Sequence, residues 1–149
     1  MLSKTHLALG IGVALYFLPH VKNELVFIPI VLIATLLPDI DSAFSLLGRS
    51  KFSRPVQWMT KHRGVLHTYT VCIVLSILFA FHSPLIALPF FLGYSFHLVL
   101  DSFTPQGIQP FWPLKYRSAG RIQTGGRVES AIYAVFVIVD AALLIKLFF

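Results

Sequence analysis

Five apolar runs, separated by polar connections, constrain this chain more than any other feature of its sequence. The runs are Leu7–Pro19, Leu25–Pro38, Val65–Phe81, Pro84–Leu100 and Ala131–Phe149. A helix needs roughly 20 apolar residues to cross the hydrocarbon core of a bilayer, and the last three runs approach that length. The first two are shorter, so we expect them to cross a thinned region or to enter the bilayer without fully crossing it. The pattern predicts an all-α integral membrane protein with four to five short membrane helices.

The composition agrees with a chain that is partly covered by lipid. Only 12% of the 149 residues are charged and 56% are hydrophobic, whereas soluble domains contain roughly 25% charged residues. The alternative is an unusually apolar soluble domain or an obligate oligomer. The length predicts a single domain, residues 1–149, and leaves the oligomeric state open. Cys72 is the sole cysteine, so an internal disulfide is excluded and a thiolate metal site is disfavoured.

The basic residues are distributed unevenly between the two ends of the expected helices. If five helices alternate in direction, the N-terminus and the connections Asp39–Gly64 and Asp101–Ser130 lie on one side. That side contains all of the 12 Lys and Arg residues except Lys22 and Lys146. Because positively charged loops remain in the cytoplasm, we expect the N-terminus and both connections to be cytoplasmic. This orientation accounts for the net charge of +6 without a nucleic-acid partner.

Histidines and carboxylates gather at the helix ends on that same side. They are His6, Asp39, Asp41, His62, His67, His97, Asp101 and Glu129. His97 and Asp101 are four residues apart, so they share one helix face. Gly64, between His62 and His67, permits a turn that brings a loop ligand beside a helical one. A single histidine or aspartate at a helix end is usually a cap or an interfacial group, but charged groups near lipid are costly and tend to be functional or paired.

This set of side chains predicts a metal site. Imidazole and carboxylate ligands without thiolate suit Zn, Mn, Fe or Mg. Seven or eight ligands exceed the needs of one tetrahedral ion, whereas two adjacent ions would use them all, and such pairs hydrolyse phosphate esters. We expect two Zn²⁺ ions, with Mn²⁺ or Mg²⁺ as alternatives. Asp41 or Glu129 would accept a proton, and Arg63 would neutralise charge on the substrate; positive-inside orientation is the simpler explanation of Arg63.

Several short motifs together resemble a known family. They are Thr5-His6, Leu37-Pro38-Asp39-Ile40-Asp41, His62-Arg63-Gly64 with His67-Thr68, His97 with Asp101-Ser102-Phe103-Thr104-Pro105, and Gly125-Gly126-Arg127 with Glu129. As a set, from Thr5 to Glu129, they resemble the YdjM-type family of membrane-bound metal-dependent hydrolases. The resemblance implies a bacterial inner-membrane protein whose ligand pattern is similar to that of the helical zinc phospholipase C class.

The leading hypothesis is a membrane-embedded hydrolase that acts on a phospholipid or another small phosphoester at the cytoplasmic face. A non-catalytic metal-binding protein, structural or sensory, is the main alternative, and it predicts a closed coordination shell. An ion transporter is disfavoured, because transporter ligands lie near the bilayer midplane and these lie at one boundary.

Overall fold

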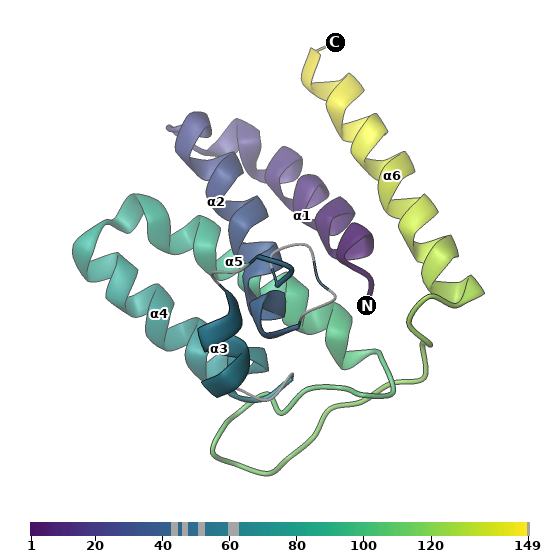
Figure 1. Cartoon of the computed structure of the whole chain (residues 1–149). Coiled ribbons are helices and arrows are strands. Elements are labelled where there is room, and N and C mark those ends of the chain that lie inside the picture. The colour runs from purple at the N-terminus through teal and green to yellow at the C-terminus, as the bar shows by residue number, and fades with distance from the viewer. Residues whose placement is uncertain (43–44, 46–47, 51–52, 60–62, 149) are drawn as a thin grey trace.

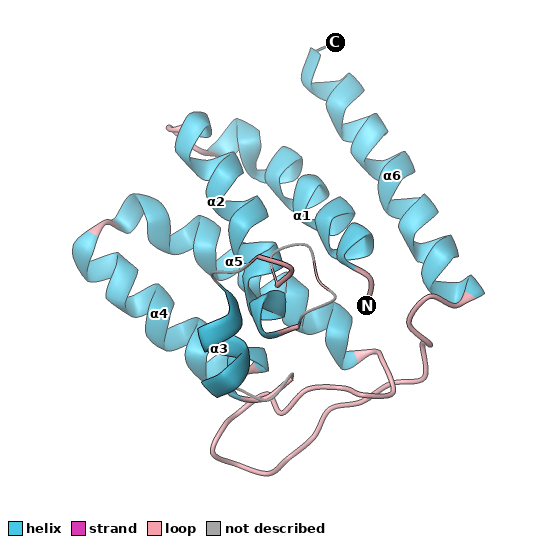
Figure 2. Cartoon of the chain, viewed as in Figure 1, coloured by secondary structure: helices cyan, strands magenta, loops and turns pink. Residues whose placement is uncertain are grey.

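Helices are the main secondary structure in the part of the chain that the structure describes. The computed structural model describes residues 1–42, 45, 48–50, 53–59 and 63–148. Its helices are α1 (Ser3–Phe17), α2 (Glu24–Leu36), α3 (Arg54–Met59), α4 (Tyr69–His82), α5 (Pro84–Ser102) and α6 (Arg127–Phe148), as Figures 1 and 2 show. Short 3-10 turns at Leu37–Asp41 (η2) and Val65–His67 (η4) precede α3 and α4. The described residues contain no β-strand, which confirms the predicted all-α class.

Two of the helices are long and apolar enough to cross a membrane. The candidate spans are Pro84–Ser102 in α5 and Arg127–Leu147 in α6, while α4 is a shorter apolar helix. The expectation that the run Val65–Phe81 approaches a full span was wrong. Its α-helix has 14 residues and begins only at Tyr69, because the preceding residues form η4 and Thr68 then caps α4 by accepting a hydrogen bond from the Val71 N–H.

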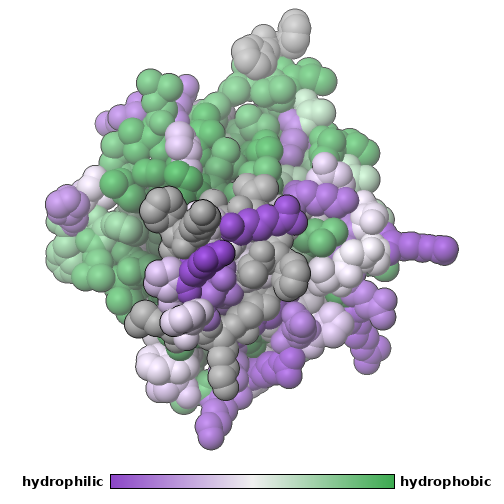
Figure 3. Space-filling view, in the orientation of Figure 1, coloured by the Kyte–Doolittle hydropathy of each residue, from purple (hydrophilic) through white to green (hydrophobic). Residues whose placement is uncertain are grey.

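The helices alternate in direction, so the functional candidates meet at one end of the bundle. This polar end comprises the start of α1, η2, α3, η4, the end of α5, the connection 103–126 and the start of α6 (Figure 1). Figure 3 shows hydrophobic surface over the helices and hydrophilic surface around this end. The connection 103–126 contains no helix, as its prolines predicted.

Small residues let three helices approach closely just below the polar end. A Cβ atom on Gly93 of α5 would lie 2.3 Å from the Val31 carbonyl oxygen and 3.0 Å from the Thr35 N atom of α2. A Cβ atom on Gly10 of α1 would lie 2.8 Å from Thr35 Oγ1. Such contacts are possible only where a side chain is missing, and they are typical of helix packing in membranes. Thr35 is therefore the point at which α1, α2 and α5 converge.

Helix α6 packs chiefly against α1 and is otherwise largely exposed. The Lys4 ammonium lies 5.0 Å from the centre of the Tyr133 ring, a favourable cation–π distance. Farther along the helix, the Asp140 carboxylate faces Gly12, where a Cβ atom would lie 2.6 Å from it. These contacts hold α6 beside the N-terminal helix rather than inside the bundle.

Candidate metal centre

Four buried side chains from three separate segments converge at the polar end. They are Asp39 of η2, His67 of η4, and His97 and Asp101 of α5, and each offers one ligand atom within 4.8 Å of the others. His67, His97 and Asp101 are 0% exposed and Asp39 is 7% exposed. Two carboxylates and two imidazoles are a ligand set that holds a divalent metal ion. We call these four residues the metal cluster.

Neighbouring backbone groups orient His97 towards the cluster. Its Nδ1 atom lies 2.7 Å from the Thr35 carbonyl oxygen, so Nδ1 carries the proton and the Nε2 lone pair faces the cluster. His97 Nε2 lies 3.7 Å from both Asp39 Oδ1 and Asp101 Oδ2. Pro38 supplies no N–H to the preceding turn, which favours an available carbonyl near Thr35. The predicted shared face of His97 and Asp101 is present in the structure.

Asp41 lies on the opposite side of the His67 ring from the cluster. Its Oδ2 atom lies 3.5 Å from His67 Nδ1, while His67 Nε2 lies 3.5 Å from Asp39 and 3.6 Å from Asp101. A carboxylate behind a ligating histidine fixes the ring orientation and makes the other nitrogen a better ligand. Asp41 is therefore a positioning residue for the His67 ring. Its role as a direct metal ligand stays a prediction.

The electrostatics of the cluster match a site for a cation. Burial raises the pKa of Asp39, but the hydrogen bond with His67 and the nearby imidazoles of His97 and His6 outweigh it and lower the pKa to about 2. Burial lowers the pKa of His67, but its hydrogen bonds to Asp39 and Asp41 outweigh it and raise the pKa to about 9. Without a metal ion, His67 is thus protonated at neutral pH and balances the buried carboxylates. A bound cation would take over that role.

His6 adds a third buried imidazole beside the cluster. Its ring stacks on that of His97 with 3.9 Å between centroids, and its Nε2 atom lies 3.3 Å from Asp101 Oδ1. In the described part of the chain, the Nδ1 atom of His6 and the Nε2 atom of His97 have no hydrogen bond. A buried polar atom without a partner costs about 1–3 kcal/mol, and a metal ion would remove that cost. The residues therefore fit a bound divalent cation.

Arg63 contacts the cluster from an unusual backbone conformation. Its φ angle is 60°, a left-handed conformation that is uncommon outside glycine and is often found at functional sites. Its guanidinium Nη2 lies 3.2 Å from Asp101 Oδ2, and its Nη1 donates to Thr104 Oγ1 at 2.6 Å and to the Gly107 carbonyl at 3.2 Å. Its backbone N–H donates to Asp41. Arg63 thereby links the metal cluster to the connection 103–126.

Glu129 is buried at the start of α6, where hydrogen bonds use both of its oxygens. Oε1 accepts from the Leu2 N–H at 2.6 Å and from Thr5 Oγ1 at 2.9 Å, and Oε2 accepts from the Gly125 N–H at 2.6 Å. These bonds tie the start of α6 to the start of α1. Glu129 is not among the four residues of the metal cluster. Its role as a metal ligand or a base stays a prediction.

The structure also shows what sequence reasoning missed. His62, which we predicted as a ligand, lies outside the described residues. The carbonyl group of Thr35 was not foreseen, because any residue has one and no sequence signal marks it. Thr104 belongs to a quoted motif, and its hydroxyl accepts from Arg63 while donating to the Asp101 carbonyl; its role was not predicted.

A cavity gives the cluster access to solvent. It has a volume of about 470 Å³, and its lining includes Asp39, Ser42, Arg63, Gln106 and Thr124. We call it the entry cavity. Because it reaches Asp39, the coordination shell is not sealed on that side, and a site with an accessible position is typical of catalytic rather than structural metals.

The chain is similar to known inner-membrane proteins. Residues 1–148 match the YdjM inner membrane protein family. Two relatives are each called "Inner membrane protein YdjM", one from Escherichia coli (strain K12) and one from Shigella flexneri. Each is 34% identical over 123 residues, which covers 74% of this chain and 63% of the relative. The chain thus spans less than two thirds of the length of these relatives.

No solved structure matches the chain. The relatives' inner-membrane designation and the candidate spans in α5 and α6 support a location in the inner membrane. With the match extending over nearly every residue, the chain belongs to the YdjM inner membrane protein family.

Proposed function

We propose that this protein is a metal-dependent hydrolase that cleaves a phosphoester at the cytoplasmic face of the inner membrane. The observation that carries the proposal is the metal cluster itself: Asp39, His67, His97 and Asp101, all buried, with ligand atoms within 4.8 Å of one another. The entry cavity that reaches Asp39 favours catalysis over the main alternative, a non-catalytic metal-binding protein with a closed shell.

We propose Zn²⁺ as the metal and two ions as the full complement, with Mn²⁺ or Mg²⁺ as alternatives. The metal cluster supplies four donor side chains. His6, 3.3 Å from Asp101, is a further imidazole donor next to it, so the donors can be shared between two ions that each keep a position for water. Bound divalent ions supply Lewis-acid activation of water and of a phosphoryl oxygen.

The protein's own residues provide the remaining functions. Arg63 borders both the cluster and the entry cavity, so its guanidinium is placed to offset negative charge on the substrate. Of the two carboxylates that the sequence suggested as proton acceptors, Asp41 contacts the ligand His67 whereas the oxygens of Glu129 serve the α1–α6 junction. Because Asp41 lies behind His67 and not over the metal cluster, we propose that it acts through that ligand, as a positioning residue. Asp41→Asn should lower zinc affinity about 10- to 100-fold and hydrolysis with it; unchanged zinc affinity in that variant would refute this role.

The proposed substrate is a lipid phosphoester or a small phosphoester at the membrane surface. The polar end contains the connections that hold most of the basic residues, and positively charged loops are retained in the cytoplasm. Hydrophobic surface covers the helices just beyond this end (Figure 3). A Ser118→Cys variant, made with Cys72→Ser, should react with a membrane-impermeant maleimide in inside-out vesicles. Labelling only in intact, right-side-out cells would reverse the proposed orientation.

Metal content and hydrolysis test the proposal directly. The purified chain is loaded with zinc, analysed for metal, and assayed with a phosphomonoester, a phosphodiester, a carboxylic ester and an amide. Asp39→Ala and His97→Ala should each lose the bound metal and the activity, whereas His82→Ala, an exposed histidine at the other end of the bundle, should retain both. If zinc-loaded protein cleaves none of these substrates, the enzymatic proposal fails and the non-catalytic alternative stands. Full metal content in both alanine variants would also refute the proposed metal site.

A further inference from the structure

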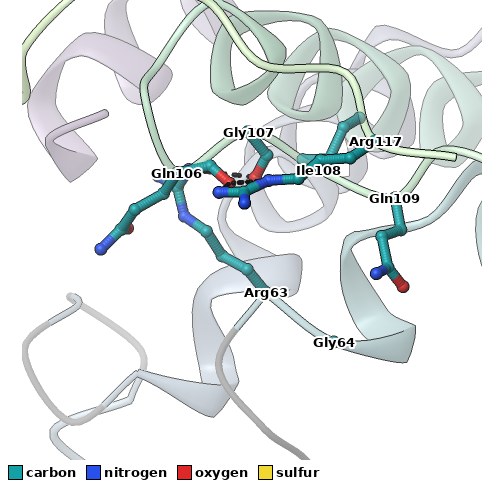
Figure 4. A pocket seen from close by; sticks show the side chains of 7 residues that line it. All are labelled: Arg63, Gly64, Gln106, Gly107, Ile108, Gln109 and Arg117. Carbon is teal, nitrogen blue, oxygen red and sulfur yellow. Dashed lines mark hydrogen bonds between the residues drawn. The ribbon is translucent and has the colours of Figure 1, made fainter. Parts of the chain in front are cut away.

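A second cavity adjoins the entry cavity on the polar end. Its volume is about 450 Å³, and its lining includes Arg63, Gln106, Gln109 and Arg117 (Figure 4). Arg63 and Gln106 line both cavities, so the two spaces lie on either side of these residues. We call this second space the arginine cavity.

The arginine cavity has the charge of an anion site. The described residues that line it include two arginines and two glutamines and no carboxylate. In the described part of the chain, Arg117 has no ion pair; its Nε and Nη2 atoms donate to the carbonyl oxygens of Gln106 and Pro105. Figure 4 shows the Arg63 and Arg117 side chains reaching the Gln106–Gly107 stretch from different directions.

Arg63 has an unused donor at this position. Its Nη1 and Nη2 atoms are occupied by Thr104, Gly107 and Asp101, but its Nε atom is buried and, among the described residues, has no hydrogen bond. The Arg63 side chain is only 10% exposed. A buried arginine donor without an acceptor is costly, and the same arginine lines the adjoining cavity.

The backbone around the arginine cavity is held in place before any ligand binds. Ile108 and Ser118 pair in an antiparallel bridge with hydrogen bonds of 2.8 and 2.9 Å. Gly107, at φ 56°, lies so close to this bridge that a Cβ atom would be 2.1 Å from the Ser118 carbonyl oxygen. Gln109 follows Ile108 and Arg117 precedes Ser118, so this pairing holds the two residues next to each other. A preorganised site loses less entropy on binding.

We propose that the arginine cavity is a subsite for a second anionic group of the substrate, a phosphate or an oxyanion of similar charge. The inference rests on the proposed function, because it places the scissile phosphoester in the entry cavity over Asp39 and the second anion beyond Arg63 and Gln106. Arg117 and Arg63 supply the charge, and Gln109 supplies an amide donor. The substrate class is therefore a phosphoester with another anionic group on its polar head, rather than a zwitterionic or neutral one.

The test measures binding of inorganic phosphate to the full chain in detergent micelles, by equilibrium dialysis, with zinc-free and zinc-loaded protein. Gln109→Glu places a carboxylate in the arginine cavity without removing a side-chain hydrogen bond among the described residues, and it should weaken phosphate binding at least about fivefold. Arg117→Gln should weaken it roughly ten- to a hundredfold. Gln123→Glu makes the same change in the same connection at an exposed position that lines neither cavity, and it should match the wild type.

Competition then identifies the source of the anion. Short-chain phosphatidate that displaces phosphate, while short-chain phosphatidylcholine does not, indicates a lipid head group; displacement by soluble glycerol phosphate alone indicates a soluble substrate. The subsite is refuted if Gln109→Glu binds phosphate as well as Gln123→Glu in both zinc-free and zinc-loaded protein, or if the wild type binds none in either form. Failure of the proposed hydrolase activity is a separate result, because it is measured by turnover and not by phosphate binding.

Discussion

Replacing Gly93 by alanine should loosen the metal cluster from a distance. The new Cβ atom would lie 2.3 Å from the Val31 carbonyl oxygen, whereas ordinary contacts of this kind begin near 3.4 Å. Because the conflict is with backbone, α2 and α5 must separate locally by about 1 Å, and overpacking of this kind typically costs about 1–3 kcal/mol. Gly93 precedes His97 by one helical turn, and Val31 precedes Thr35 by one turn.

The separation should therefore reach the metal ligand. The distance from His97 Nδ1 to the Thr35 carbonyl oxygen, now 2.7 Å, would grow to about 3.7 Å, beyond hydrogen-bonding range. Loss of such a supporting bond behind a ligating histidine typically reduces metal affinity 10- to 100-fold. We expect that reduction for zinc, measured by competition with a chromophoric chelator in detergent-solubilised protein.

Gly12→Ala is the matched control, because it makes the same change in another apolar helix. Among the described residues, a Cβ atom there would meet the carboxylate group of Asp140, with Oδ1 at 2.6 Å and Cγ at 3.8 Å, and a rotation of that side chain moves the oxygen away. Zinc affinity in Gly12→Ala should equal that of the wild type. If Gly93→Ala binds zinc as tightly as Gly12→Ala, the close approach of α2 and α5 does not position His97, and the reasoning is refuted.

Three further results are expected. In the metal-free protein the pKa of His67 is about 9 and that of Asp39 is about 2, so zinc must displace one proton, from His67. Zinc affinity should therefore fall up to about tenfold for each unit by which the pH is lowered from 9 to 7. A flat pH profile in chelator titrations would contradict this. Glu129→Gln should lower the thermal unfolding midpoint, because the amide nitrogen must face one of the N–H groups that now donate to the carboxylate, and each such bond contributes about 1.5–3 kcal/mol. Zinc affinity should stay at the wild-type value; lost zinc binding would instead make Glu129 a ligand. Arg63→Lys should retain zinc but lose most hydrolysis, because a single ammonium cannot reach Asp101 and the connection 103–126 together as the guanidinium does; unchanged turnover would show that the forked geometry is dispensable.

Much of the fold was predictable because it depends on local properties of the chain. The length of an apolar run determines whether a helix can span a bilayer, and the spacing of His97 and Asp101 determines that they share a face. The limit of that reasoning is visible at Val65–Phe81, where the apolar residues Val65 and Leu66 belong to the turn η4 with His67 and not to the membrane helix. Apolar composition alone does not distinguish the two, because the turn is stabilised by groups elsewhere, such as the Tyr94 hydroxyl that donates to the Leu66 carbonyl.

The sequence by itself determined that this is a helical membrane protein with most of its imidazoles and carboxylates at one end, since alternating helices must bring those connections to the same side. Only the tertiary structure decided which of them form the metal cluster. Asp39 and Asp41 are two residues apart, yet one faces the cluster and the other lies behind His67, and Glu129 is engaged by Leu2, Thr5 and Gly125. These differences arise from contacts between residues distant in the chain, above all the close approach of α2 and α5 at Gly93, which no local pattern encodes.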